Sequence, residues 1–146
     1  MSREAVEVVR RIYGYNWAST RDRRAALELA GELIGDSFEY QLDPTVFGDR
    51  TLTAITELRT VLEGVDQDFR DFRQRPDEFI EAGATDAGER VVVLGEIVGH
   101  GRVSGVPFRS SFGHVWTIRD RKAVRLEGYL DHDVALAAAG RPARRR

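Results

Sequence analysis

The residues with the clearest chemical potential lie in one alternating stretch near the end of the chain. Because side chains alternate along a strand, one face of this stretch is aromatic apart from a serine, an isoleucine and a single imidazole. That face carries Phe108, Ser110, Phe112, His114, Trp116 and Ile118. An imidazole among large apolar rings can be a general base, a hydrogen-bonding group that orients a ligand, or a satisfied core residue. The sequence leaves all three roles of His114 open.

The chemistry available to His114 depends on which residue of the next strand lies opposite it. In the register that we favour, Ile118 pairs with Val124 and His114 lies opposite Gly128. The bare glycine would then leave space over the imidazole and enlarge a ligand cavity. In the competing register, shifted by one residue, Glu127 lies opposite His114 and the two form an acid/base pair.

Earlier segments supply the other candidate site residues. Tyr13 and Trp17 share the apolar stripe of a predicted first helix, where they act either as core or as a ligand platform. Asn16 beside them needs hydrogen-bond partners if it is buried, and Tyr40 points its hydroxyl into the cavity or to solvent. The predicted pocket is mainly apolar, with His114 as the candidate catalytic residue. Its other lining residues are Asn16, Trp17, Tyr40, Phe112, Trp116, Leu126 and Leu130.

The periodicity of the chain predicts an α+β fold with helices first and strands after them. Helices are expected over residues 2–17, 22–35 (capped by Asp22), 52–64 and 133–139, and strands over 38–42, 69–82, 90–100, 108–118 and 123–131. We expect a cone-shaped, curved antiparallel sheet wrapped around the N-terminal helices, with a short C-terminal helix. Residues 1–140 form a single domain, and the basic residues 141–146 form a disordered tail.

Composition excludes several classes of protein and site. The formal net charge of -2 gives no field that would attract nucleic acid, and no apolar run is long enough for a membrane span. The chain has no cysteines, so it has no disulfides and no thiolate zinc site, which suits the cytoplasm. Its three histidines lack metal-ligand spacing. We therefore expect no metal, no cofactor, no nucleic acid and no membrane partner, and a cytoplasmic location.

One strand is apolar on both faces. Residues 91–98 place Val92, Leu94 and Val98 on one side and Val91, Val93 and Ile97 on the other. A sheet with one solvated face does not need this pattern. It predicts that a partner subunit covers the outer face in a homodimer.

Several strings, taken in their order, resemble the SnoaL-like family of the nuclear-transport-factor-2-like (NTF2-like) superfamily over residues 4–140. They are Val8-Val9-Arg10-Arg11-Ile12-Tyr13 with Asn16-Trp17 and Asp22, Phe38-Glu39-Tyr40 with Asp43-Pro44, Gly48-Asp49-Arg50, Gly105-Val106-Pro107, His114-Val115-Trp116-Thr117-Ile118 and Tyr129-Leu130-Asp131. The resemblance implies the cone fold. It does not imply one activity, because the superfamily includes polyketide cyclases, steroid isomerases, epoxide hydrolases and binding proteins.

The family's functional positions are only partly present. A pocket histidine of the polyketide cyclases corresponds to His114. Their general acid or base would lie seven residues beyond a turn glycine, but that turn position is Arg121 here and the count reaches Gly128, which cannot transfer a proton. The arginine, asparagine and tyrosine of the similar epoxide hydrolases correspond to Gly95, Leu42 and Tyr40.

These observations favour a SnoaL-like pocket protein that binds a small apolar compound of polyketide, steroid or terpenoid type. One alternative is a cofactor-free cyclase, isomerase or epoxide hydrolase in which His114 moves the proton and Tyr40 or Asn16 stabilises negative charge. The other is a non-catalytic dimeric assembly module whose functional surface is the sheet. In the favoured register Glu127 and Asp131 belong to the rim or an interface, so the feature that separates the alternatives is whether any carboxylate reaches the cavity.

Overall fold

The structure is a computed structural model that describes residues 2–17, 20–43, 51–53 and 55–142. Part of the family resemblance, Pro44 and Gly48-Asp49-Arg50, lies outside the described residues. So does the arginine run at the end of the predicted tail, from residue 143 onward.

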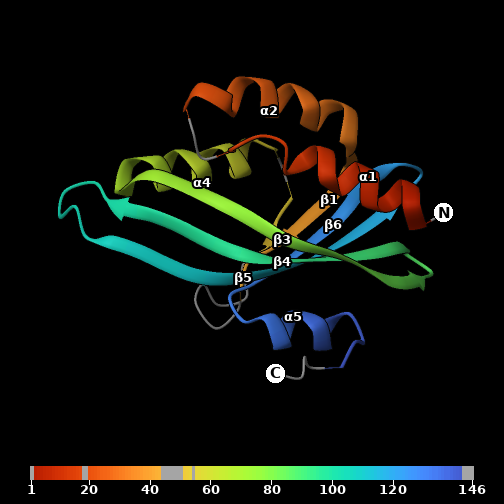
Figure 1. The fold of residues 1–146 in the computed structure, drawn as a ribbon. Coiled ribbons are helices and arrows are strands. Elements are labelled where there is room, and N and C mark those ends of the chain that lie inside the picture. Colours follow the sequence, from red (N-terminus) through yellow and green to blue (C-terminus); the bar gives the residue numbers. More distant parts are fainter. Residues whose placement is uncertain (1, 18–19, 44–50, 54, 143–146) are drawn as a thin grey trace.

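A six-stranded curved sheet in the order β2-β1-β6-β5-β4-β3 forms the centre of the fold (Figure 1). Its strands are β1 (Ile34–Gln41), β2 (Thr51–Leu52), β3 (Phe69–Thr85), β4 (Gly88–Gly101), β5 (Pro107–Arg119) and β6 (Lys122–Tyr129). All neighbouring pairs are antiparallel except β1 and β6, which run parallel, so the sheet is mixed. The predicted α+β class and the four long strands are confirmed.

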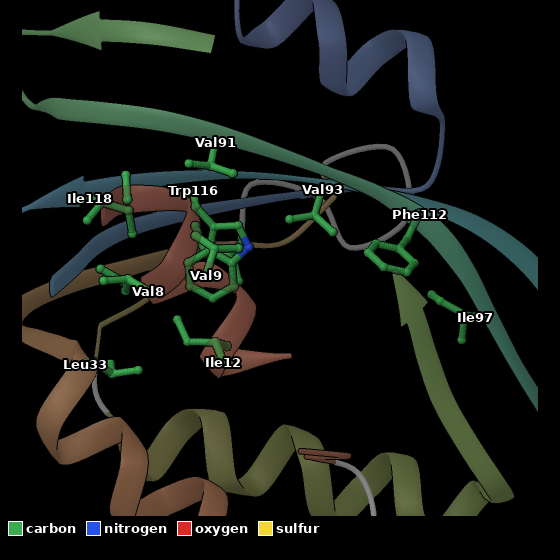
Figure 2. Packing of buried hydrophobic residues seen from close by; sticks show 13 residues of the cluster. Val8, Val9, Ile12, Leu33, Val91, Val93, Ile97, Phe112, Trp116 and Ile118 are labelled. Carbon is green, nitrogen blue, oxygen red and sulfur yellow. The ribbon is translucent and has the colours of Figure 1, made fainter. Parts of the chain in front are cut away.

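Of the helices in the described part of the chain, three lie on one face of the sheet and one lies on the other, as Figure 1 shows. The first three are α1 (Ser2–Ile12), α2 (Thr20–Leu33) and α4 (Ile55–Asp68), and the last is α5 (His132–Ala138). The apolar stripe of α1 packs on the inward side chains of β4 and β5, and this contact forms the main core (Figure 2). Burial of Val9, Val91 and Phe112 to 1% exposure or less marks its centre.

The N-terminal helices differ from their predicted bounds. The first ends at Ile12, where the Trp17 indole donates a hydrogen bond to the Ile12 carbonyl at 2.7 Å and satisfies a group that the helix end leaves free. Asp22 does not cap α2. It lies inside the helix, and its carboxylate accepts a hydrogen bond from the backbone N–H of Asn16 at 2.9 Å. Leu52 belongs to β2, and α4 continues beyond Gly64 to Asp68.

The second apolar face of β4 is partly covered from within the same chain. Val92 and Leu94 pack with Val115 of β5 against Ala135 and Leu136 of α5. This contact accounts for the two-sided apolar pattern at Val92 and Leu94, so that pattern does not require a partner subunit there. Val98, further along the strand, is only partly buried.

The register between β5 and β6 contains a bulge that combines both predicted alternatives. Next to the turn, Ile118 pairs with Ala123, as in the competing register. A bulge between Ile118 and Thr117 then takes up one extra residue of β6. Thr117 therefore pairs with Arg125, and the favoured register is restored. His114 therefore lies opposite Gly128.

Candidate functional site

An apolar cavity lies between the sheet and the helices, and we call it the inner chamber. Its volume is about 80 Å³. It is lined by Ile12, Tyr13, Trp17, Ile34, Phe38, Tyr40, Leu58, Leu62, Gln74, His114, Trp116 and Leu126. Five residues predicted from sequence, Trp17, Tyr40, His114, Trp116 and Leu126, therefore meet around one cavity.

A hydrogen-bond chain determines the protonation of His114. The Trp116 indole, which can only donate, donates from Nε1 to the Tyr13 hydroxyl at 3.0 Å. The Tyr13 hydroxyl in turn contacts Nδ1 of His114. The Tyr13 hydroxyl has no other acceptor for its proton among the described residues, so donation to Nδ1 satisfies more groups than the reverse, and we assign Nδ1 as the unprotonated nitrogen. The neutral ring then carries its proton on Nε2.

Burial keeps this chain neutral. His114 is 5% exposed, and its burial lowers the pKa from 6.5 to about 3. Burial also raises the pKa of Tyr13 well above its usual value. Both shifts have the same cause, since a charged form loses its hydration inside the protein. Near neutral pH, His114 is an uncharged N–H donor whose basic nitrogen is already occupied by Tyr13.

Tyr40 fills the space that the sequence predicted to be empty. A Cβ added at Gly128 would lie 3.3 Å from the Tyr40 ring and 3.4 Å from its hydroxyl oxygen. Gly128 thus admits the Tyr40 ring rather than enlarging the cavity over His114. Burial raises the pKa of Tyr40 to about 12, so the hydroxyl stays protonated. Neither this hydroxyl nor Nε2 of His114 has a hydrogen-bond partner among the described residues.

The chamber has no carboxylate in the part of its lining that the structure describes. Glu127 pairs with Val115 on the opposite face of the sheet. There it accepts from the Tyr129 hydroxyl at 3.0 Å and forms an ion pair with Arg125 at 3.6 Å. The acid/base pair of the competing register is therefore not formed.

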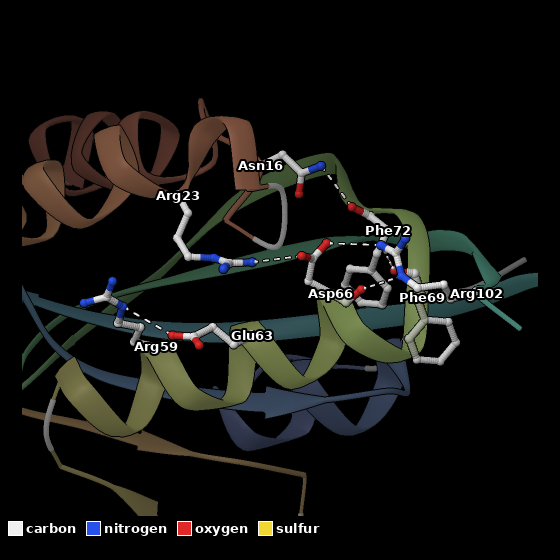
Figure 3. A network of polar contacts seen from close by, with 8 residues as sticks. All are labelled: Asn16, Arg23, Arg59, Glu63, Asp66, Phe69, Phe72 and Arg102. Carbon is white, nitrogen blue, oxygen red and sulfur yellow. Dashed lines mark hydrogen bonds and ion pairs between the residues drawn. The ribbon is translucent and has the colours of Figure 1, made fainter.

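Three predicted lining residues lie elsewhere. Phe112 is buried in the core, with its ring centroid 4.5 Å from that of His114. Asn16 donates to the Phe72 carbonyl at 2.9 Å (Figure 3). It also lines a neighbouring cavity of about 50 Å³. Leu130 lies beyond the end of β6 and is 37% exposed. Its backbone amide donates to Asp43 at 2.8 Å.

The sequence does not indicate the role of Tyr13, for which it predicts a core residue or a ligand platform. Its ring contacts are of that kind, since it lies parallel to Phe112 and edge-on to Trp116. Only its hydroxyl joins two polar side chains from a strand about a hundred residues away. The signal available in the sequence was the pairing of an indole and an imidazole two residues apart on one strand face, which calls for a shared polar partner.

The described residues contain no group of three histidine, aspartate or glutamate side chains placed to bind a metal. Within the same residues, no helix is both long and apolar enough to cross a membrane.

No protein-family model and no curated protein matches the chain, but many solved structures resemble it. An NTF2-like protein of unknown function from Burkholderia pseudomallei is 24% identical over 92% of this chain and 95% of its own, with a TM-score of 0.66. TerC, co-crystallised with polyporic acid, is 25% identical over 93% and 97%, with a TM-score of 0.66. A Jannaschia protein named for its likeness to SnoaL polyketide cyclases is 14% identical over 96% and 94%, with a TM-score of 0.69.

Proposed function

We propose that this chain, which has the NTF2-like fold, is a SnoaL-like protein that binds a small apolar molecule and holds one acceptor oxygen of it in the inner chamber. Polyketide-, steroid- and terpenoid-like compounds fit this description, because they combine apolar rings with isolated carbonyl groups. The co-crystallisation of TerC with polyporic acid supports small-molecule binding on this fold.

The observation that carries the proposal is that His114 lines the apolar chamber while its Nδ1 is held by Tyr13, which leaves Nε2–H of the assigned tautomer for a ligand. Binding sites of this kind are mostly apolar with a few polar groups that orient the ligand. The hydroxyl of Tyr40, which has no hydrogen-bond partner among the residues that the structure describes, supplies a second donor. A ligand carbonyl that reaches both donors gains hydrogen bonds that the protein does not make by itself.

The same geometry supports binding more strongly than general-base catalysis. A base needs a free lone pair, and the one on Nδ1 is taken by Tyr13. An enzymatic role for His114 would use it as a donor that stabilises an oxyanion, with Tyr40 beside it. Such a cyclase or isomerase would need a proton acceptor from outside the described lining of the chamber.

We further propose that the protein is a cytoplasmic homodimer. The outer sheet face is not fully covered beyond α5, because Val98 of β4, on the same face as Val92 and Leu94, is only partly buried. A second copy packed there would use the outer sheet face as its assembly surface. Light scattering at micromolar concentration should give the mass of a dimer, and a monomer would refute this part of the proposal.

The binding proposal is tested with 2-acetyl-6-(dimethylamino)naphthalene, a fluorescent ketone whose emission moves to the red when its carbonyl accepts a hydrogen bond. Wild-type protein is expected to bind the dye with hydrogen-bonded emission. In His114→Leu the emission should move to the blue and the affinity should fall about 5- to 10-fold, which corresponds to one lost hydrogen bond. His100→Asn, at a histidine outside the chamber, is the control. Binding whose emission is unchanged in His114→Leu would refute the role of His114.

A further inference from the structure

A larger second cavity, the outer cleft, adjoins the inner chamber. Its volume is about 440 Å³, and it lies between α2, β1, β2 and α4. Its lining is largely apolar, with Leu27, Ala30 and Gly31 from α2 and Leu52 from β2. The two cavities share four lining residues, Ile34, Phe38, Tyr40 and Leu58. The outer cleft is therefore separated from His114 only by a wall of side chains.

The sizes of the two cavities determine what each can hold. An apolar cavity of about 150 Å³ binds benzene, and the inner chamber has roughly half that volume. The inner chamber thus has room for a carbonyl or acetyl group and not for a ring. The outer cleft falls within the range of about 300 to 1,000 Å³ that is usual for small-molecule sites. An apolar ring system fits there.

Phe38 forms the movable part of the shared wall. Its ring is only partly buried and stacks on Trp116, with centroids 6.4 Å apart and planes 28° apart. The ring has no polar atom, so rotating it away breaks no hydrogen bond. The neighbouring Tyr40 hydroxyl would then face both cavities.

The charge around the outer cleft also limits its occupant. Besides Tyr40, the polar lining residues are Asp36 and Thr53, and both are exposed. The cleft has no cation in the part of its lining that the structure describes. A carboxylate or phosphate on the ligand body would meet the negative charge of Asp36 without a compensating partner. A cation would gain little, because Asp36 is exposed and exposed ion pairs contribute little to binding. The body of the ligand is therefore uncharged.

We infer that the ligand is an elongated, uncharged ketone whose ring system occupies the outer cleft and whose carbonyl end passes Phe38 to reach His114. Phe38 then determines specificity, because its position limits the width of the group that can enter the inner chamber. This inference rests on the proposed function and adds the shape of the ligand and its route.

Gly31 offers a direct test, because it lines the outer cleft and a Cβ at this position would have no atom within 4 Å. Gly31→Phe should fill the cleft with no clash at its Cβ, and replacing a glycine in a helix favours folding. Gly31→Ala controls for the helix effect. Gly64→Phe is the matched control, since Gly64 in α4 is equally unobstructed and lines neither cavity.

With the same naphthyl ketone, Gly31→Phe is expected to weaken binding at least tenfold, while Gly31→Ala and Gly64→Phe bind like wild type. Wild-type affinity and hydrogen-bonded emission in Gly31→Phe would overturn the inference and leave the proposed function intact. Emission independent of His114 would instead overturn the proposed function. Phe38→Ala gives a second measure: it should bind the benzoyl analogue of the dye at least tenfold more tightly than wild type does, and equal affinities would rule out the gating role.

Discussion

Burial of His114 makes a specific prediction about how the stability of this protein depends on pH. The pKa of His114 is about 3 in the folded protein and 6.5 in the unfolded chain. Between these values the unfolded chain binds a proton that the folded protein excludes, so lowering the pH favours unfolding. Titration of His114 therefore leaves the free energy of unfolding unchanged above pH 6.5 and lowers it progressively as the pH falls from 6.5 toward 3.

The loss amounts to about 1.4 kcal/mol per pH unit within this window. It therefore reaches about 2 kcal/mol at about pH 5 and about 4 kcal/mol at about pH 3, where half of the folded protein also binds the proton. The upper part of the window is the informative one, because carboxylates with ordinary pKa values of about 4 are still ionised at about pH 5. A loss of about 2 kcal/mol is a large share of the stability of a domain of this size.

The measurement is urea unfolding of wild type and His114→Asn at several pH values from about 7 to about 5. Asparagine stays neutral in both states and can still accept a hydrogen bond from Tyr13, so the variant should lose about 2 kcal/mol less than wild type over this range. His100→Asn, at a side chain that is 41% exposed, is the control for the loss of an imidazole outside the chamber. Equal pH slopes for wild type and His114→Asn would show that His114 is hydrated or charged in the folded protein, and the tautomer argument would fail with it.

Two further changes test the packing around the site. Tyr13→Phe should lower the free energy of unfolding by about 1 to 3 kcal/mol, because it leaves the Trp116 indole and Nδ1 of His114 without their partner. Tyr15→Phe, at an exposed ring, should have little effect. Equal unfolding curves for the two variants would contradict the hydrogen-bond chain. Gly113→Ala should cost about 1 to 3 kcal/mol, because its Cβ would lie 2.4 Å from that of Ala135 and push α5 away from the sheet, and a variant as stable as wild type in thermal unfolding would contradict this placement of α5.

The sequence alone was sufficient to predict the class of fold. Alternation in the last four long strands and the apolar stripe of α1 are local patterns, and a strand or helix face is determined by side-chain spacing within one segment. The family strings pointed to the NTF2-like superfamily, and the solved structures confirm that fold. Boundaries were less certain: α1 stops at Ile12 because Trp17 folds back onto its last carbonyls, a contact that the helical spacing of Trp17 concealed.

The position of the acidic residue was the question that local patterns could not answer. Both registers of β5 and β6 satisfied the alternation, and the bulge after Ala123 uses one at the turn and the other at His114. A shift of one residue reverses every side chain, so this small irregularity decides that Glu127 faces away from the chamber.

Residue types along the chain thus determined that an imidazole would lie among aromatic rings near a glycine. Only the tertiary structure decided what that imidazole can do, because its chemistry depends on groups that are distant in sequence. Tyr13 takes its basic nitrogen, Tyr40 fills the space at Gly128, and burial keeps the ring neutral. Hydrogen-bond partners and dielectric environment are properties of packing, which alternation and spacing do not encode.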